Sequence, residues 1–268
     1  MKSYLYAALS AVFLFIGMTP AIADPGGPGL YEITLQSDDH GEVGLTRVWN
    51  TSQDLHIKVI TSDDWLITEY QIYVGRDPIP LKKGKVVPGK FPWVDEVDPP
   101  GTTHELVLDM SEDIGFSWGP KASGDRVYNL ALHVDLEKPG FEDEVITDSA
   151  WARGPYLIGD YHNKWYAMYE LAHPMRGQFI DAPVQGLNYH GPTQQGFTGV
   201  DIYGEKGGFP FFPHEEITFS LGEVVLGKAT AAKRISPLDL FHGSDTTDPR
   251  VIDVARILQT LDQDSGAE

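Results

Sequence analysis

The chain has 268 residues, a formal net charge of −19 and no cysteine. This acidity argues against a nucleic-acid partner, because phosphate binding needs a basic surface. The absence of cysteine excludes disulfides and thiolate chemistry. A hydrophobic content of 41%, with 12 Phe, 12 Tyr and 6 Trp, is enough to bury a core. The 28 glycines and 19 prolines are typical of short strands joined by many turns.

Residues 1–23 have the pattern of a secretory signal peptide, with a positive charge, an apolar run and small residues before a cleavage site between Ala23 and Asp24. The apolar run is too short to be a good membrane span. We therefore expect an exported protein, periplasmic or extracellular, with no membrane span in the mature chain. Residues 24–30 are rich in glycine and proline, which predicts a flexible linker.

The stretch from Leu55 to Val74 alternates apolar and polar residues on both sides of a polar turn at 61–64. Period-two alternation with β-branched and aromatic residues predicts two half-buried strands, which we expect to form a hairpin. Val127 to Val134 is another strand, with Tyr128, Leu130, Leu132 and Val134 on one face. Short strands separated by turns, without a long amphipathic helix, predict an antiparallel β-sandwich over 31–172.

Residues 173–177 form the expected junction, and 178–268 a smaller β domain. Residues 216–221 and 223–229 predict a hairpin around Gly222. Ser236 and Asp248 are each followed by proline, the pattern of an N-cap before the first helical residue. Apolar residues at helical spacing after Asp248 predict a C-terminal α-helix. The predicted fold class is therefore mainly β: an antiparallel β-sandwich followed by a smaller β domain with a C-terminal α-helix.

Several motifs occur in a fixed order between residues 54 and 172. They are Asp64-Trp65-Leu66-Ile67-Thr68-Glu69, Tyr73-Val74-Gly75, Pro88-Gly89-Lys90-Phe91-Pro92, Ala131-Leu132-His133-Val134, Ser149-Ala150-Trp151-Ala152 and Lys164-Trp165-Tyr166-Ala167. Together they resemble a β-rich module that recurs in exported surface proteins of bacteria and archaea. That module has no assigned activity. Where it has Glu-Thr-His, this chain has Glu69-Tyr70-Gln71, so we expect no histidine-dependent site there.

A second set of motifs covers residues 179 to 264. It comprises the segment Phe179 to Leu187, the hairpin at 216–222, Leu226-Gly227-Lys228-Ala229, Ser236 to Leu240 and Val251 to Asp262. These motifs are similar to a module of bacterial surface lipoproteins and adhesin-like proteins. The resemblance implies a surface protein.

No metalloprotease, nucleophile-elbow, dinucleotide-binding or P-loop motif is present, and the nine histidines show no metal-ligand spacing. Asp262 and Asp264 form an i, i+2 carboxylate pair. Alternate acids in a loop can point inward together onto Ca²⁺, which prefers hard oxygen ligands. The pair is therefore a candidate calcium site, with a solvated tail as the alternative.

Trp93, Trp118 and Trp151 lie in or beside predicted loops. Exposed rings there could stack on sugars, whereas packing at the ends of the sandwich is the alternative. Our leading hypothesis is an exported, non-enzymatic β protein for surface association or ligand binding, with a carbohydrate or a cell-surface protein as partner. The alternatives are a secreted polysaccharide-active enzyme that uses a carboxylate pair, and a calcium-stabilised extracellular assembly subunit.

Overall fold

The computed structural model describes residues 29–118, 126–180, 184–199 and 206–264; at 143 and 261–264 it describes only the backbone. The predicted signal peptide and most of the predicted linker lie outside these residues. We call residues 31–172 the first domain and 173–264 the second domain. The strands of the first domain are β1 (Tyr31–Ser37), β2 (Gly41–Asn50), β3 (Asp54–Thr61), β4 (Leu66–Gly75), β5 (Leu81–Lys82), β6 (Lys85–Val86), β7 (Trp93–Gly101), β8 (Thr103–Asp109), β9 (Val127–Pro139), β10 (Val145–Ala152), β11 (Tyr156–Leu157) and β12 (Trp165–Glu170).

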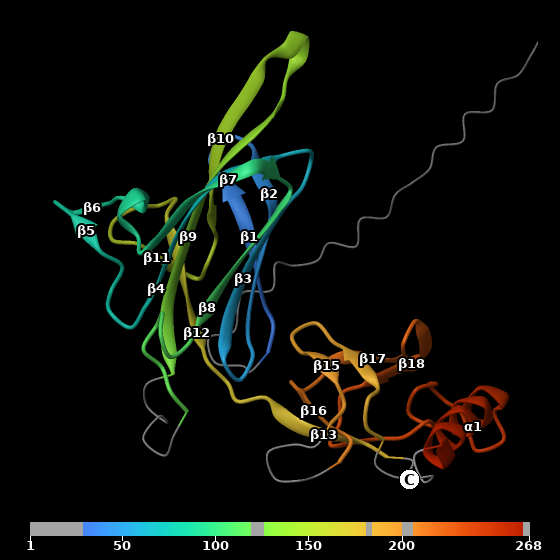
Figure 1. Cartoon of the computed structure of the whole chain (residues 1–268). Helices are drawn as coiled ribbons and strands as arrows, with labels where there is room; N and C mark the ends of the chain where they lie inside the picture. The colour runs from blue at the N-terminus through green and yellow to red at the C-terminus, as the bar shows by residue number, and fades with distance from the viewer. Residues whose placement is uncertain (1–28, 119–125, 181–183, 200–205, 265–268) are drawn as a thin grey trace, which may run out of the picture.

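Among the described residues, ten strands of the first domain form one antiparallel sheet (Figure 1). Strand β9 lies at its centre and pairs with β4 on one side and with β12 and β10 on the other. From β10 the sheet continues through β1, β2 and β3 to β8, and from β4 it continues to β7. The sheet curls until it nearly closes, since Tyr70 of β4 stacks on His104 of β8 with ring centroids 4.4 Å apart. The prediction of a mainly β protein with antiparallel sheets is confirmed.

The two strands predicted within residues 55–74 are present as β3 and β4, but they do not form a hairpin with each other. Strand β3 pairs with β2 and β8, whereas β4 pairs with β9 and β7. The turn between them contains Asp63 and Asp64, both with positive φ, and leads to the fully buried Trp65. Alternation predicts which side chains face the core, but it does not specify the neighbouring strand, and for that reason the predicted pairing was wrong.

The inner face of the curled sheet encloses the main core of the first domain. The predicted inward face of β9 is confirmed, because Tyr128, Leu130, Leu132 and Val134 are each at most 2% exposed. A smaller apolar cluster covers part of the outer face. It contains Tyr73, Ile79, Val86, Phe91, Ala131, Trp151 and Ile158. Ile79 and Val86 come from the segment between β4 and β7, so that segment folds back over the sheet.

The second domain contains two small sheets and one helix. The strands are β13 (Met175–Phe179), β14 (Asn188–His190), β15 (Gln195–Phe197), β16 (Gly208–Phe211), β17 (Glu216–Leu221), β18 (Val224–Thr230) and β19 (Arg234–Ile235). Strand β13 pairs with β16 and β19, while β15, β14, β17 and β18 form the other sheet. The hairpin predicted around Gly222 is confirmed as β17 and β18. The core of the second domain is a separate apolar cluster around Phe179, Phe209 and Phe219.

The predicted C-terminal helix is confirmed as α1 (Pro249–Asp264). Asp248 caps it, because the backbone N–H of Arg250 donates to the Asp248 Oδ1 atom over 2.9 Å. Val254 and Leu258 pack into the core of the second domain, as the helical spacing predicts. Ser236 caps no helix; its backbone N–H and hydroxyl both donate to the carboxylate of Asp239 in a turn. Within the described residues, no helix combines the length and the apolar character that crossing a membrane requires.

Thr46 of β2 offers a test of the core. It is 0% exposed, and its hydroxyl has no hydrogen-bond partner among the described residues. An unpaired buried hydroxyl costs roughly 1–3 kcal/mol. Thr46→Val keeps the shape and removes the hydroxyl, so we expect it to raise the free energy of unfolding by about 1 kcal/mol, measured by urea denaturation. The reverse change at the neighbouring inward position, Val48→Thr, should destabilise the protein; if Thr46→Val destabilises it too, the hydroxyl has a partner.

Candidate functional site

Buried polar contacts hold the two domains against each other. The side chain of Asn50, at the end of β2, accepts hydrogen bonds from the Tyr169 hydroxyl (3.0 Å) and from the backbone N–H of Ala172 (3.1 Å). The backbone carbonyl of Asn50 accepts a hydrogen bond from the amide of Gln194 in the second domain (3.0 Å). Asn50 and Gln194 are both buried. Buried polar groups demand fixed partners, so these contacts define how the second domain meets the first.

Glu215 belongs to the same contact region. One of its carboxylate oxygens accepts from the Thr193 hydroxyl (2.5 Å) and the other from the backbone N–H of Phe212 (3.2 Å). Burial raises the pKa of the Glu215 carboxyl, and these two hydrogen bonds oppose that rise only in part. Burial also raises the pKa of Tyr169, so this hydroxyl stays protonated and can donate. Burial thus makes ionisation of Glu215 less favourable in the folded protein than in water.

A groove follows β13 where the domains meet. On one side of the strand lies a cavity of about 320 Å³, within the usual size range of ligand sites. Its walls are mainly apolar and come from both domains: Ser52, His173, Pro174, Met175, Arg176, Gly177, Phe197, Gly199, Gly208, Phe209 and Pro210. Phe197 is 71% exposed, so most of this ring is open to solvent at the cavity.

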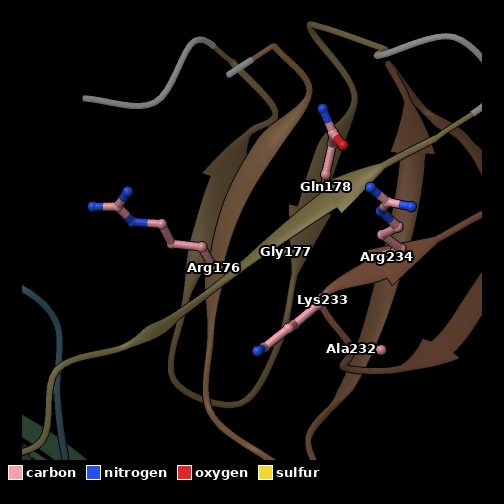
Figure 2. Close-up of a pocket in the computed structure, with 6 residues that line it drawn as sticks. All are labelled: Arg176, Gly177, Gln178, Ala232, Lys233 and Arg234. Carbon is pink, nitrogen blue, oxygen red and sulfur yellow. The ribbon is translucent and has the colours of Figure 1, made fainter. Parts of the chain in front are cut away.

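A broad basic depression of about 610 Å³ lies on the other side of β13. Its lining includes Arg176, Lys233 and Arg234 (Figure 2). In the view of Figure 2, Arg176 and Lys233 extend on opposite sides of the strand, and Arg234 lies beside Gln178. These cations are spread over an open surface, so the depression suits an extended anionic group more than one small ion. Arg176 and Gly177 line both the cavity and the depression. The two hollows therefore form one continuous surface, which we call the β13 groove.

Gly177 allows the groove to form. A Cβ atom at this position would lie 2.3 Å from the ring of Phe209, far inside van der Waals contact. Strand β13 can therefore approach Phe209 closely only without a side chain here. This packing brings Phe209 of β16 into the apolar wall, while Lys233 and Arg234 lie on the other side of β13, where it pairs with β19.

The three tryptophans predicted to bind ligand do not form one platform. Trp118 packs on His173 (ring centroids 4.6 Å apart), and its indole N–H donates to the carbonyl of Ser52 over 2.7 Å. His173 and Ser52 both line the β13 groove, so Trp118 supports the wall of that groove. Trp151 is only 4% exposed and belongs to the outer-face cluster. Trp93 is paired with the inward-facing Ile72 and packs against the main core.

Polar residues of β4 and β9 form a second cluster on the outer face. Gln71, His133 and Trp151 are direct neighbours across β4, β9 and β10. The imidazole Nδ1 of His133 faces the amide oxygen of Gln71, while the Gln71 amide nitrogen donates to Glu69 (2.7 Å) and Asp135 (3.0 Å). The two carboxylates are within about 6 Å of each other, close to the spacing of retaining glycosidases, but the Gln71 amide occupies the space between them.

Burial lowers the pKa of His133 to about 4, opposed by the charge of Asp135 and reinforced by that of Lys164. The imidazole is therefore neutral at neutral pH, consistent with donation from Nδ1 to Gln71. Lys164 lies over the Trp151 ring, with its ammonium nitrogen 5.1 Å from the ring centroid. The motifs that carry the first sequence resemblance thus lie close together in the structure. Their side chains mainly pack against one another and form hydrogen bonds with one another.

Ser37, His40 and Asp148 lie together at one end of the curled sheet, but they are not a catalytic triad. The Ser37 hydroxyl donates to Asp148 Oδ2, and the Nδ1 atom of His40 is 2.7 Å from that same oxygen. In a triad the serine hydroxyl must instead donate to the histidine. Here both residues bind the carboxylate, and Ser37 also accepts hydrogen bonds from the backbone N–H groups of Asp39 and His40, as in a turn.

The predicted calcium ligands Asp262 and Asp264 fall in the last turn of α1. Residues two apart on a helix lie on roughly opposite sides of it, so the loop geometry assumed for this site does not describe the backbone. The side chains of these residues are outside the described part of the chain, and the calcium site stays a prediction. Among the side chains that are described, no group of three or more histidines and acids could hold a metal ion.

Comparisons with known proteins found no match among protein-family models, curated proteins or solved structures. The two sequence resemblances therefore stay predictions. The groove was not predictable from the sequence, which identifies 173–177 only as a junction. The adjacent Lys233 and Arg234 were the available signal, because two cations side by side are uncommon in so acidic a chain.

The neutral state of His133 predicts a pH dependence. A histidine with a lowered folded pKa stabilises the fold above its ordinary pKa of 6.5, and this contribution is lost as pH falls through 6.5 toward about 4. The shift corresponds to roughly 3 kcal/mol. We expect His133→Gln to lose less stability than the parent between neutral pH and pH 4, measured by urea denaturation. The same change at the exposed His162 is the control, and an equal acid dependence of His133→Gln and the parent would contradict the assignment.

Glu215 predicts a pH dependence of stability of the opposite sign. An acid with a raised folded pKa contributes most when protonated, and its contribution declines as pH rises above its ordinary value of 4.5. Gln mimics the protonated acid, so Glu215→Gln should be at least as stable as the parent at neutral pH, with a flatter pH dependence above 4.5. Thermal unfolding followed from acid to neutral pH checks this, and Glu216→Gln, at the exposed neighbouring position, is the matched control.

Proposed function

We propose that the chain is an exported, non-enzymatic binding protein whose ligand lies in the β13 groove. The observation that carries this proposal is the groove itself, an apolar hollow that joins a basic surface on a protein of net charge −19. Cations beside an apolar hollow are informative on so acidic a chain, since charges at a binding surface mainly determine specificity and encounter. Neither Lys233 nor Arg234 belongs to an ion pair within the described residues.

The groove defines the chemistry of its ligand. Phe197 offers an exposed ring face to an apolar surface, and Lys233 and Arg234 offer N–H donors to carboxylates. A ligand that carries carboxylates beside an apolar face satisfies both sides. Uronic-acid oligosaccharides have this chemistry, and so do acidic protein segments with an exposed aromatic residue. Both sources agree with surface association through a carbohydrate or a cell-surface protein.

Isothermal titration calorimetry with an oligogalacturonate, a neutral oligosaccharide and an acidic aromatic peptide tests this proposal and distinguishes the two sources. We expect at least one acidic ligand to bind and the neutral one not to bind. Lys233→Glu/Arg234→Glu should weaken binding by about tenfold or more, because hydrogen bonds to charged groups contribute roughly 1.5–3 kcal/mol each. Phe197→Ser should also weaken it.

Lys82→Glu/Lys83→Glu is the matched control, because it makes the same charge change on exposed residues of the first domain. If this variant lowers affinity as much as the groove variant, binding depends on overall charge and the groove is not the site. Binding of neither acidic ligand would overturn the proposal. Release of shortened products from the oligosaccharide would instead indicate the alternative, a polysaccharide-active enzyme.

A further inference from the structure

The hairpin of β9 and β10 extends beyond the rest of the sheet (Figure 1). Strand β4 pairs with β9 only as far as Glu137, and β1 pairs with β10 only from Ala150 onward. Beyond these limits the ladder continues only as Lys138 and Pro139 of β9 paired with Ile146 and Val145 of β10, and residues 140–144 connect the two strands. A two-stranded extension of this kind gains little stability by itself.

The tip of this ribbon presents apolar side chains to solvent. Phe141 is 81% exposed, the highest value among the exposed large hydrophobic side chains described, and Val145 is 60% exposed. Glu142 and Glu144, also exposed, lie between Phe141 and Val145 in the sequence. The tip thus carries an aromatic residue next to negative charges, which is the chemistry that the β13 groove fits.

Backbone hydrogen bonds hold the tip in one conformation. The N–H of Gly140 donates to the carbonyl of Glu144 (2.7 Å), and the N–H of Glu144 donates to the carbonyl of Phe141 (3.2 Å). A tip that is already ordered loses less conformational entropy on binding than a flexible loop. It is therefore suited to insertion into a complementary groove.

We propose that the β9–β10 tip of one copy docks into the β13 groove of a second copy, so that the protein assembles head to tail. In Figure 1 the tip and β13 lie at opposite ends of the molecule, so one chain cannot bring its own tip to its own groove. The charges are complementary, with Glu142 and Glu144 facing Lys233 and Arg234, and Phe141 enters beside Phe197. Such a contact is heterologous, so it builds open chains or closed rings of copies.

This inference rests on the proposed function, because it names the partner of the same groove. Sedimentation velocity over a range of protein concentrations tests it, with protein expressed from its complete coding sequence and purified after processing by the host. We expect the average mass to rise with concentration and to fall when salt is added, since salt screens the charge pairs. Phe141→Ser should leave a monomer at every concentration.

Charge reversal gives a sharper test. Glu142→Lys/Glu144→Lys and Lys233→Glu/Arg234→Glu should each be monomeric alone, because tip and groove then carry like charges. An equimolar mixture should associate again, since each tip then meets a groove of opposite charge. A mixture that stays monomeric would overturn the proposal. The matched control is Val224→Ser/Val225→Ser, which removes exposed apolar residues at the turn between β17 and β18 and should leave association unchanged.

The outcomes separate this inference from the proposed function. A protein that binds an acidic ligand through Lys233 and Arg234 but stays monomeric at all concentrations retains the binding function and refutes self-assembly. Association that persists in Phe141→Ser also refutes the proposal, because another surface is then responsible. Loss of both ligand binding and association in every test would refute the groove as a binding site.

Discussion

Strand β9 is the element on which the rest of the first domain depends. Its thirteen residues pair with β4 along one side and with both β12 and β10 along the other. Period-two alternation sends one set of its side chains into the core and the other set to the outer face. The same strand then continues past its neighbours into the ribbon that carries Phe141. Core, outer-face cluster and protruding tip are therefore parts of one continuous backbone ladder.

A second constraint acts at the junction of the domains. Asn50 uses its side chain to hold the end of the first domain and its backbone carbonyl to receive Gln194 of the second. A buried amide has fixed hydrogen-bonding needs, so it favours one arrangement over many similar ones. This arrangement brings Ser52 beside His173 and Phe209, and thus creates the groove from segments far apart in the sequence.

Sequence patterns were most informative where apolar residues recur at a regular spacing. The inward face of β9, the β17–β18 hairpin and the apolar stripe of α1 were all predictable, because alternation and helical spacing follow directly from backbone geometry. The pairing of β3 with β4 was predicted wrongly, because neighbouring strands in sequence can join different parts of a curled sheet. Trp151 was predicted as a candidate platform, yet it is buried because the segments after β4 and after β10 fold over the outer face.

The candidate site was even less predictable from the sequence than the strand pairing. His173 to Gly177 could be identified as a junction, and Lys233 and Arg234 could be seen as neighbouring cations, but nothing in their spacing connects them. They meet because β13 pairs in parallel with β19, a contact between residues more than fifty positions apart. Charge and aromatic content were visible in the chain, whereas their convergence required the pairing of the strands.

By itself, the sequence determined the mainly β character, the inward faces of the strands and the C-terminal helix, because these depend on local periodicity. Only the tertiary structure decided which strands pair, which tryptophans are buried and where the cations gather. Such contacts join distant residues, and their free energy comes from burying surfaces that no local pattern pairs in advance. The chain thus encodes its elements locally and its groove only through their assembly.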